Sequence, residues 1–146
     1  MTYRLDNILN TMASSMSAES IRMNITASNL ANAGSVGPSE EETYHAKHPV
    51  FSTITQSLSG LSDIDQPVGG VRVTDVTTNQ NPLEWRYDPG NPHADKDGHV
   101  YLTDVNPIEE MTDMISASRQ YQAAAEVTTT TKQLLMQTIR AIQEIE

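Results

Sequence analysis

Residues 106–146 read NPIEEMTDMISASRQYQAAAEVTTTTKQLLMQTIRAIQEIE, with one proline at the second position and no glycine. Asn106 followed by Pro107 is typical of a helix start, because Asn caps the first turn and Pro suits the first helical position. Glu109 and Glu110 place acidic side chains in the first turn, where the helix dipole favours them. The pattern predicts one helix from residue 107 to the end of the segment, about 40 residues long.

Two sets of positions with spacings of three and four run along this segment, and each set marks one face of a helix. The first set is Ile108, Met111, Ile115, Ser118, Gln122, Ala125, Thr129, Lys132, Met136 and Ile139. The second set is Met114, Ala117, Tyr121, Ala124, Thr128, Thr131, Leu135, Thr138, Ile142 and Ile145. Two such faces indicate contacts on two sides, as in a bundle or a polymer. The threonine run 128–131 weakens intrinsic helicity, so we expect this helix to need packing partners.

Residues 1–34 predict a second helix at the other end of the chain. Its heptad-like face is formed by Leu5, Leu9, Met12, Met16, Met23 and Leu30, with Glu19 and Thr26 at the two interrupted positions. Ala and Ser are frequent at the remaining positions, which lack a Lys/Glu coat, and this favours burial on more than one side. An ordinary amphipathic core helix explains the apolar face equally well. Asn32-Ala33-Gly34 predicts a left-handed C-cap.

Residues 35–106 are acidic, with 4 basic and 11 acidic side chains, and contain most of the prolines and glycines. Alternating residues predict short strands, and the ranges are 44–55 with an interruption at Pro49, 71–73, 83–87 and 100–102. Asp88-Pro89-Gly90-Asn91-Pro92 predicts a turn, and residues 56–69 predict a flexible loop. We therefore expect a mainly α protein in three parts: an N-terminal helix in residues 1–34, a small irregular β element in residues 35–106, and a C-terminal helix in residues 107–146.

Composition excludes several functional classes. The net charge of −10 argues against nucleic-acid binding, which relies on Lys and Arg at phosphates. The chain has no cysteine, so thiolate metal sites and thiol catalysis are excluded. We see no apolar run of roughly 20 residues and no cleavable signal peptide.

No catalytic constellation is recognisable in the sequence, so we predict neither an enzyme, nor a cofactor, nor a small-molecule substrate. His45 and His48 have a spacing that suits a metal on a helix, but Pro49 disfavours a helix there. The segment 95–98 (DKDG) is weakly similar to a calcium loop, and a hydrophilic turn is the simpler interpretation. We therefore predict no metal site.

Two segments resemble the rod-protein family of the bacterial flagellum. Residues 23–34 (MNITASNLANAG) are similar to the S-x-N-L-A-N type motif of rod, hook and junction proteins. The stretch 87–92 (YDPGNP) and the segment 114–127 (MISASRQYQAAAEV) resemble the proximal-rod subunits within that family. The sequence departs from the family pattern at Ala124, where Asn is usual, and in longer segments near 39–43 and 56–69, which we expect at a surface.

The resemblance implies a non-enzymatic structural subunit of the proximal rod. In that family the two terminal helices pair as an antiparallel coiled-coil hairpin and polymerise into a rod that links the membrane ring to the distal rod and hook and transmits torque. The implied location is the periplasm-spanning rod of the basal body, reached through flagellar type III export. The implied partners are further copies, other rod subunits and, as a further candidate, the membrane ring. A soluble acidic helical adaptor or chaperone-like binding protein is the alternative.

The predicted assembly interface follows from the helix faces and the matched motifs. It comprises Leu9, Met16, Met23, Asn29, Leu30, Asn32, Met114, Ile115, Arg119, Tyr121, Leu135 and Ile139. We expect Leu30 and Ile139 to be buried between helices of the assembled rod, and Arg119 and Tyr121 to act together at a subunit contact. For Asn29 and Asn32, local capping and hydrogen bonding between subunits are both open interpretations.

Overall fold

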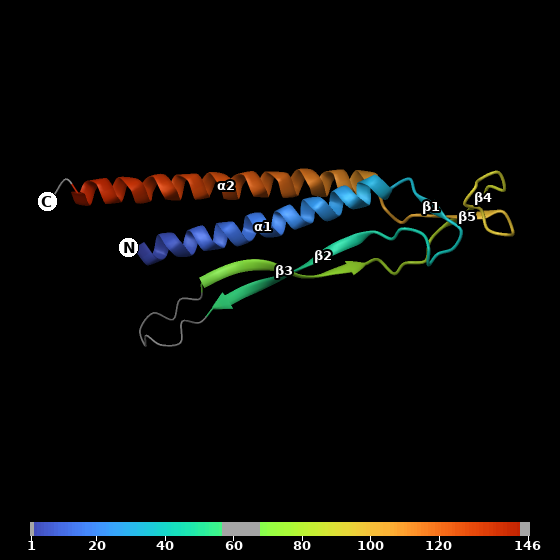
Figure 1. The fold of residues 1–146 in the computed structure, drawn as a ribbon, viewed down its shortest axis with the longest axis horizontal. Coiled ribbons are helices and arrows are strands. Elements are labelled where there is room, and N and C mark those ends of the chain that lie inside the picture. Colours follow the sequence, from blue (N-terminus) through green and yellow to red (C-terminus); the bar gives the residue numbers. More distant parts are fainter. Residues whose placement is uncertain (1, 57–67, 144–146) are drawn as a thin grey trace. The chain divides into compact units, whose positions relative to one another are not determined.

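The computed structural model describes residues 2–56 and 68–143, and its contacts divide the chain into two compact units (Figure 1). The first unit contains Met1–Ile21, Phe51–Thr74 and Ala117–Glu146, and the second contains Arg22–Val50 and Asp75–Ser116. The helices α1 (Thr2–Asn32) and α2 (Pro107–Gln143) and the strands β2 (Lys47–Gln56) and β3 (Val68–Thr78) each contribute to both units. The strands β1 (Val36–Gly37), β4 (Trp85–Tyr87) and β5 (His99–Leu102) belong to the second unit.

The start of α2 confirms the prediction from Asn106 and Pro107. The helix begins at Pro107, and the Asn106 side chain accepts a hydrogen bond from the Ile108 N–H at 3.1 Å. The threonine run is accommodated because its hydroxyls bond back to the helix: Thr128 donates to the Ala124 carbonyl at 2.8 Å. The helix therefore continues without a break for 37 residues.

The end of α1 differs from the predicted cap. The helix ends at Asn32, but Gly98 is the only glycine with a positive φ among the described residues, so Gly34 is not left-handed. Instead, the Ser35 N–H and hydroxyl both donate to the Asn32 carbonyl, at 3.0 and 2.8 Å. A short serine turn thus satisfies the carbonyl of the last helical residue, which has no partner within the helix.

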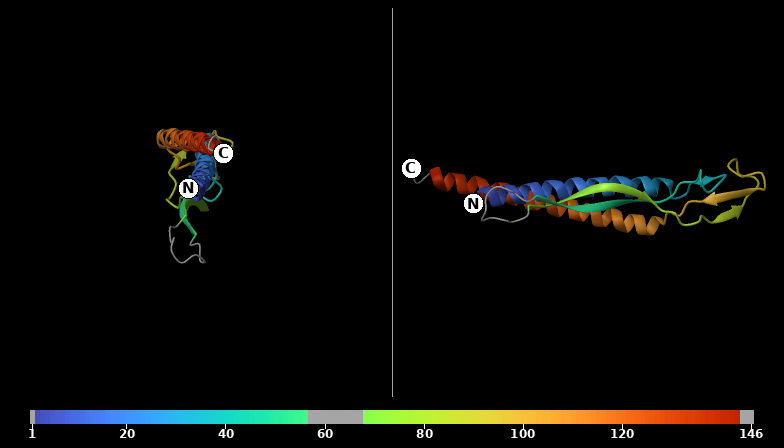
Figure 2. Two further views of the ribbon diagram at one scale, coloured as in Figure 1. Left: turned by 90° about the vertical axis from the view of Figure 1, so that its left-hand side faces the viewer. Right: turned by 90° about the horizontal axis from the view of Figure 1, so that it is seen from below.

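The described strands form two sheets. The first is antiparallel in the order β1-β5-β4, with Val36 opposite Leu102 and Arg86 opposite Val100. The second pairs β2 with β3, which run in opposite directions (Figure 1). The two strands cross in the right-hand view of Figure 2, since a two-stranded ribbon twists strongly.

Pro49 does not interrupt β2 as the sequence had indicated. The N–H and C=O of Lys47 bond to the Asn29 side chain, which places the backbone groups of Lys47 on the side away from β3. Pro49 lies two residues further along β2 and shares that side, so its missing N–H costs no sheet hydrogen bond.

The prediction of a mainly α coiled-coil hairpin with a small irregular β element is wrong. The strands β2 and β3 are 10 and 11 residues long, and α1 bonds directly to this ribbon. The Thr11 hydroxyl donates to the Gly69 carbonyl, and the Val71 N–H donates to the Ser14 hydroxyl at 3.2 Å. Small residues of α1 such as Ser14 therefore allow close approach of a strand. No described helix is both long enough and apolar enough to span a bilayer.

Each unit has its own small core. In the second unit Val100 is fully buried, and Leu83, Val105 and Ala46 are almost fully buried. In the first unit the buried apolar side chains among the described residues are Ala18, Ala117 and Ala124. Because alanine buries little apolar area, the first unit gains little stability from its own core.

Candidate assembly interface

Asn29 is the centre of the second unit. Its side chain is fully buried and makes four hydrogen bonds, the most that an asparagine amide can form with two donors and two acceptor sites. The amide nitrogen donates to the Lys47 carbonyl and to the Glu110 carboxylate, both at 2.8 Å. The amide oxygen accepts from the Tyr44 hydroxyl at 2.9 Å and from the Lys47 N–H at 3.0 Å. One side chain therefore joins α1, the start of β2 and the first turn of α2.

Glu110 and Tyr44 complete this network and were not predicted as site residues. Glu110 is buried, although its position in the first turn suggested only an interaction with the helix dipole. Tyr44 also shares a hydrogen bond with the Ser28 hydroxyl at 3.2 Å. The only sequence signal was the polar Asn29 beside Leu30, which does not identify partners that lie far away along the chain.

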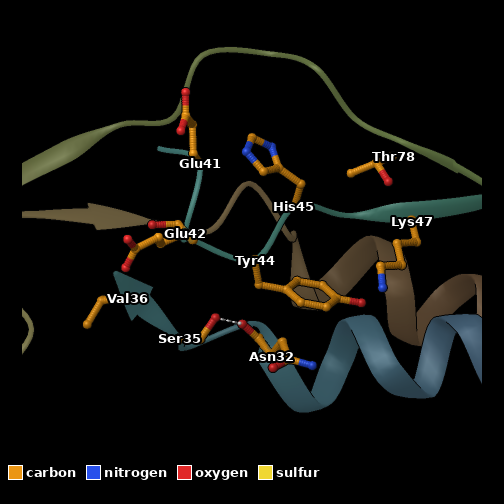
Figure 3. Close-up of a pocket in the computed structure, with 10 residues that line it drawn as sticks. Asn32, Ser35, Val36, Glu41, Glu42, Tyr44, His45, Lys47 and Thr78 are labelled. Carbon is orange, nitrogen blue, oxygen red and sulfur yellow. Dashed lines mark hydrogen bonds between the residues drawn. The ribbon is translucent and has the colours of Figure 1, made fainter. Parts of the chain in front are cut away.

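A shallow depression of about 550 Å³ lies next to this network (Figure 3). Its lining residues are Asn32, Ser35, Val36, Glu41, Glu42, Thr43, Tyr44, His45, Lys47 and Thr78. The Lys47 ammonium lies 5.4 Å from the centre of the Tyr44 ring, in cation–π range. Across the described residues, no three His, Asp or Glu side chains are grouped so that they could hold a metal ion.

The acidic segment 39–43 is fixed to the second unit at both ends. Glu40 accepts a hydrogen bond from the Leu83 N–H at 3.2 Å, and Thr43 is buried with its hydroxyl donating to the Ser39 carbonyl at 2.6 Å. Glu41 and Glu42 are exposed. The other departure, near 56–69, lies mostly outside the described residues.

The two predicted faces of α2 have different environments. In the second set, Ala117, Ala124 and Thr131 are buried, and Met114, Tyr121, Thr128 and Leu135 are half-buried. In the first set, Ile108, Met111, Ile115, Met136 and Ile139 are 75, 54, 53, 49 and 49% exposed. From Met114 to Leu135 the second set thus packs within the chain, whereas Thr138 is exposed and the side chains of Ile142 and Ile145 lie outside the described part. The first set leaves large apolar side chains in water. We refer to Ile108, Met111, Ile115, Met136 and Ile139 as the outer face of α2.

The predicted residues of α1 lie closer to the interior. Leu9, Met16, Met23 and Leu30 are all half-buried, and Asn32 donates to the Ser28 carbonyl at 2.8 Å within its own helix. In the second unit the two helices are also joined by an ion pair between Arg22 and Asp113, at 3.1 Å.

Arg119 and Tyr121 are not brought together. Residues two apart on a helix point to different sides, and here Arg119 is exposed whereas Tyr121 is half-buried. A joint role of the two at a subunit contact stays a prediction for the assembled state.

Comparison with known proteins identifies the family. A family described as flagella basal body rod protein matches residues 9–38, and the flagellar basal body rod FlgEFG protein C-terminal family matches residues 96–141. The chain is 42% identical over 135 residues to the flagellar basal-body rod protein FlgC of Buchnera aphidicola subsp. Schizaphis graminum, covering 91% of this chain and 94% of the relative.

Other bacteria have similar proteins. The FlgC protein of Yersinia enterocolitica is 41% identical over 91% of this chain and 94% of its own length. The FlgC protein of Aquifex aeolicus is 36% identical over 92% of this chain and 95% of its own length. This similarity extends over nearly the whole chain, including both helices and the β region between them. The chain therefore belongs to the FlgC family of flagellar basal-body rod proteins.

Proposed function

We propose that this chain enters the proximal part of the flagellar rod by packing the outer face of α2 against neighbouring subunits. The chain is a structural subunit of the basal-body rod and not an enzyme, as its family membership indicates. The neighbours proposed here are further copies of the chain and other rod subunits, with the membrane ring as a further candidate.

The exposed outer face of α2 is the observation that carries this proposal. Within the second unit, Ile108, Met111 and Ile115 lie on successive turns of α2, and each is more than half exposed. Burying one such side chain fully is worth about 1.5–3 kcal/mol, so a face of this kind strongly favours association. Rod growth requires contacts that repeat head to tail, and exposed apolar side chains on one side of a helix suit such contacts.

The remaining parts of the proposed role rest on the family. We place the subunit between the membrane ring and the distal rod and hook, where it transmits torque across the periplasm. Export through the flagellar type III channel would deliver it there. The absence of cysteine suits such a route, because no disulfide can form during passage into an oxidising compartment.

An acidic adaptor or chaperone-like protein was the alternative from sequence. It is not favoured, because the relatives that match nearly the whole chain are rod proteins.

The test is a charge placed on the outer face of α2. Ile115→Asp should lower the amount of chain in purified basal bodies at least tenfold, because a carboxylate would be buried against an apolar neighbour. Gln120→Asp, at an exposed position on a different side of α2, is the matched control and should assemble nearly normally. Equal incorporation of both variants, measured by immunoblot of purified basal bodies, would refute the proposed contact.

A further inference from the structure

The open edge of the β1-β5-β4 sheet carries exposed aromatic side chains. The strand β4 is the last strand of this sheet, and its residues Trp85 and Tyr87 are 59 and 65% exposed. Both rings pack edge-on against His99 of β5, with centroid distances of 4.5 and 5.7 Å. Val100, the next residue along β5, is fully buried, so the three rings lie on the outer face of the sheet.

The backbone at this edge is also open. The Leu102 N–H donates to the Glu84 carbonyl at 2.8 Å. The Asp88 N–H donates to the carbonyl of Gly98, the residue before β5, also at 2.8 Å. In an antiparallel pair, alternate residues bond to the partner strand, so Glu84 and Asp88 mark the inward-facing positions. The N–H and C=O groups of Trp85 and Tyr87 therefore point away from β5, where the described part of the chain provides no further strand.

The residue types distinguish this edge from a merely protected one. Proteins shield sheet edges by keeping them short and by placing proline or lysine there, and Pro82 and Pro89 do flank β4. However, the edge positions themselves carry Trp and Tyr, which are enriched at protein interfaces where Lys is depleted. The strand is also held rigidly, because its neighbour Leu83 is buried and bonds to Glu40 at 3.2 Å.

The described strands of this chain do not offer a good partner for that edge. β1 is only two residues long, and β2 and β3 already use outward backbone groups in bonds to side chains. Those bonds run from the N–H of Lys47 to Asn29, from the N–H of Val71 to Ser14, and from the N–H of Val76 to Asp75. Pairing β4 with β4 of a second copy would be isologous and would close into a dimer, which cannot extend a rod.

The charges around the edge indicate the kind of segment that fits. The strand β4 with its preceding residue and the turn that follows it carry four carboxylates and two basic side chains: Glu84, Asp88, Asp95, Asp97, Arg86 and Lys96. Opposite charge on the incoming segment would be favoured. Alternate apolar side chains on that segment would pack on the exposed rings of Trp85 and Tyr87.

We infer that the edge of β4 is a strand-addition site for an extended, net-basic segment of a different rod subunit. The incoming segment pairs its backbone with Trp85 and Tyr87 and packs apolar side chains on the aromatic face. This inference rests on the proposed function, since it assumes that the chain stands beside other rod subunits.

Site-specific photo-crosslinking in assembled rods tests the inference. A tagged full-length chain carries p-benzoylphenylalanine at Trp85 or at Tyr87 in cells of the bacterium that makes it. Basal bodies are purified after irradiation, and the crosslinked residues are mapped by mass spectrometry. We expect both probes to mark one segment of another rod protein, with the marked residue shifted by two between the probes. That shift is the signature of a paired strand, whereas a partner helix would give a shift of three or four.

Each of the other outcomes overturns either the inference or the proposed function, and the two cases can be told apart. Crosslinks to residues 85–87 of a second copy would mean isologous pairing, and crosslinks to a helix would mean a different contact. An absence of crosslinks in rods that contain the tagged chain would also overturn strand addition. Absence of the unmodified tagged chain from basal bodies would instead contradict the proposed function.

A second measurement tests the inference without the photo-probe, in case the chains that carry the probe fail to assemble into basal bodies. The double variant Trp85→Ala/Tyr87→Ala should reduce incorporation into basal bodies on the order of tenfold, as interface aromatics often do. The control Gln80→Ala, at an exposed position in the loop before β4, should leave incorporation unchanged. Normal incorporation of the double variant would overturn the inference.

Discussion

At the scale of single residues, Asn29 holds three segments together, and its replacement tests this directly. Asn29→Ala removes the hydrogen bonds that the Asn29 side chain makes with the Glu110 carboxylate and with the N–H and C=O of Lys47 in a buried site. We expect the free energy of unfolding to fall by about 3 kcal/mol, because buried polar groups would lose their partners. Urea denaturation followed by circular dichroism measures the loss.

Asn32→Ala is the matched control for that variant. The Asn32 amide makes one exposed hydrogen bond to its own helix, so its loss should cost under about 1 kcal/mol. Equal costs for the two variants would show that the buried network does not stabilise the second unit.

Gly98 tests the backbone conformation that positions Tyr87. Its φ is +81°, and a Cβ at this position would lie 2.9 Å from the Tyr87 ring. We expect Gly98→Ala to destabilise the protein by about 1–3 kcal/mol, since both the positive φ and the close contact oppose a side chain. Thermal unfolding provides the measurement.

Gly34→Ala is the natural comparison for Gly98→Ala. No atom lies within 4 Å of a Cβ built there, and the residue lacks a positive φ. The substitution should be neutral or stabilise by up to about 1 kcal/mol. A loss as large as that of Gly98→Ala would contradict the assignment.

Asp95, in the turn before β5, should make the stability of the fold depend on pH. The backbone N–H of His99, 2.7 Å from the carboxylate, lowers the pKa of Asp95 below its usual value of 3.8, and the Asp97 N–H contributes at 2.9 Å. A lowered pKa in the folded state stabilises the fold above pH 3.8, and this stabilisation is lost as the pH falls through the folded-state pKa. Asp95→Asn should therefore flatten the decline in melting temperature below about pH 4, whereas Asp97→Asn should not.

At the scale of elements, the capping of α2 is open to a simple test. Removing the Asn106 side chain leaves the Ile108 N–H at the first turn without its acceptor. Asn106→Ala should lower the free energy of unfolding by about 1 kcal/mol, and Asn106→Asp should retain most of the stability. If both variants unfold at the same urea concentration, the cap does not contribute.

The helices could be predicted because their signals are local. Asn106 and Pro107 mark the start of α2, and the spacing of three and four along the helix separates a buried set from an exposed set. The lengths of β2 and β3 could not be predicted, because Pro49 reads as a strand breaker unless its outward position is known. The strand β1 is only two residues long and has no periodicity to detect.

The site was predictable in part for the same reason. The outer-face residues follow from helical spacing, which depends only on neighbours along the chain. The partners of Asn29 lie 15 to 81 residues away, so only the folded chain brings them together. Exposure was also invisible in the sequence, since alternation at Trp85 and Tyr87 predicts a strand but not an open edge.

At the scale of the whole molecule, surface and interior have two different roles. The buried Asn29 network and the second set of α2 positions stabilise the chain itself. The outer face of α2 and the aromatic edge of β4 remain exposed and are proposed for neighbouring subunits. A rod subunit needs both, because it must fold far enough to present its contact faces and still gain most of their burial on assembly.

Cysteine accessibility at the outer face of α2 tests that claim most directly, since the natural chain contains no cysteine. Ile115→Cys is labelled with a maleimide in the purified free chain and in purified basal bodies, with Glu41→Cys in the exposed acidic segment as the control. The account predicts rapid labelling of both variants in the free chain and at least tenfold slower labelling of Ile115→Cys alone in basal bodies. Equally rapid labelling of Ile115→Cys in both states would contradict it.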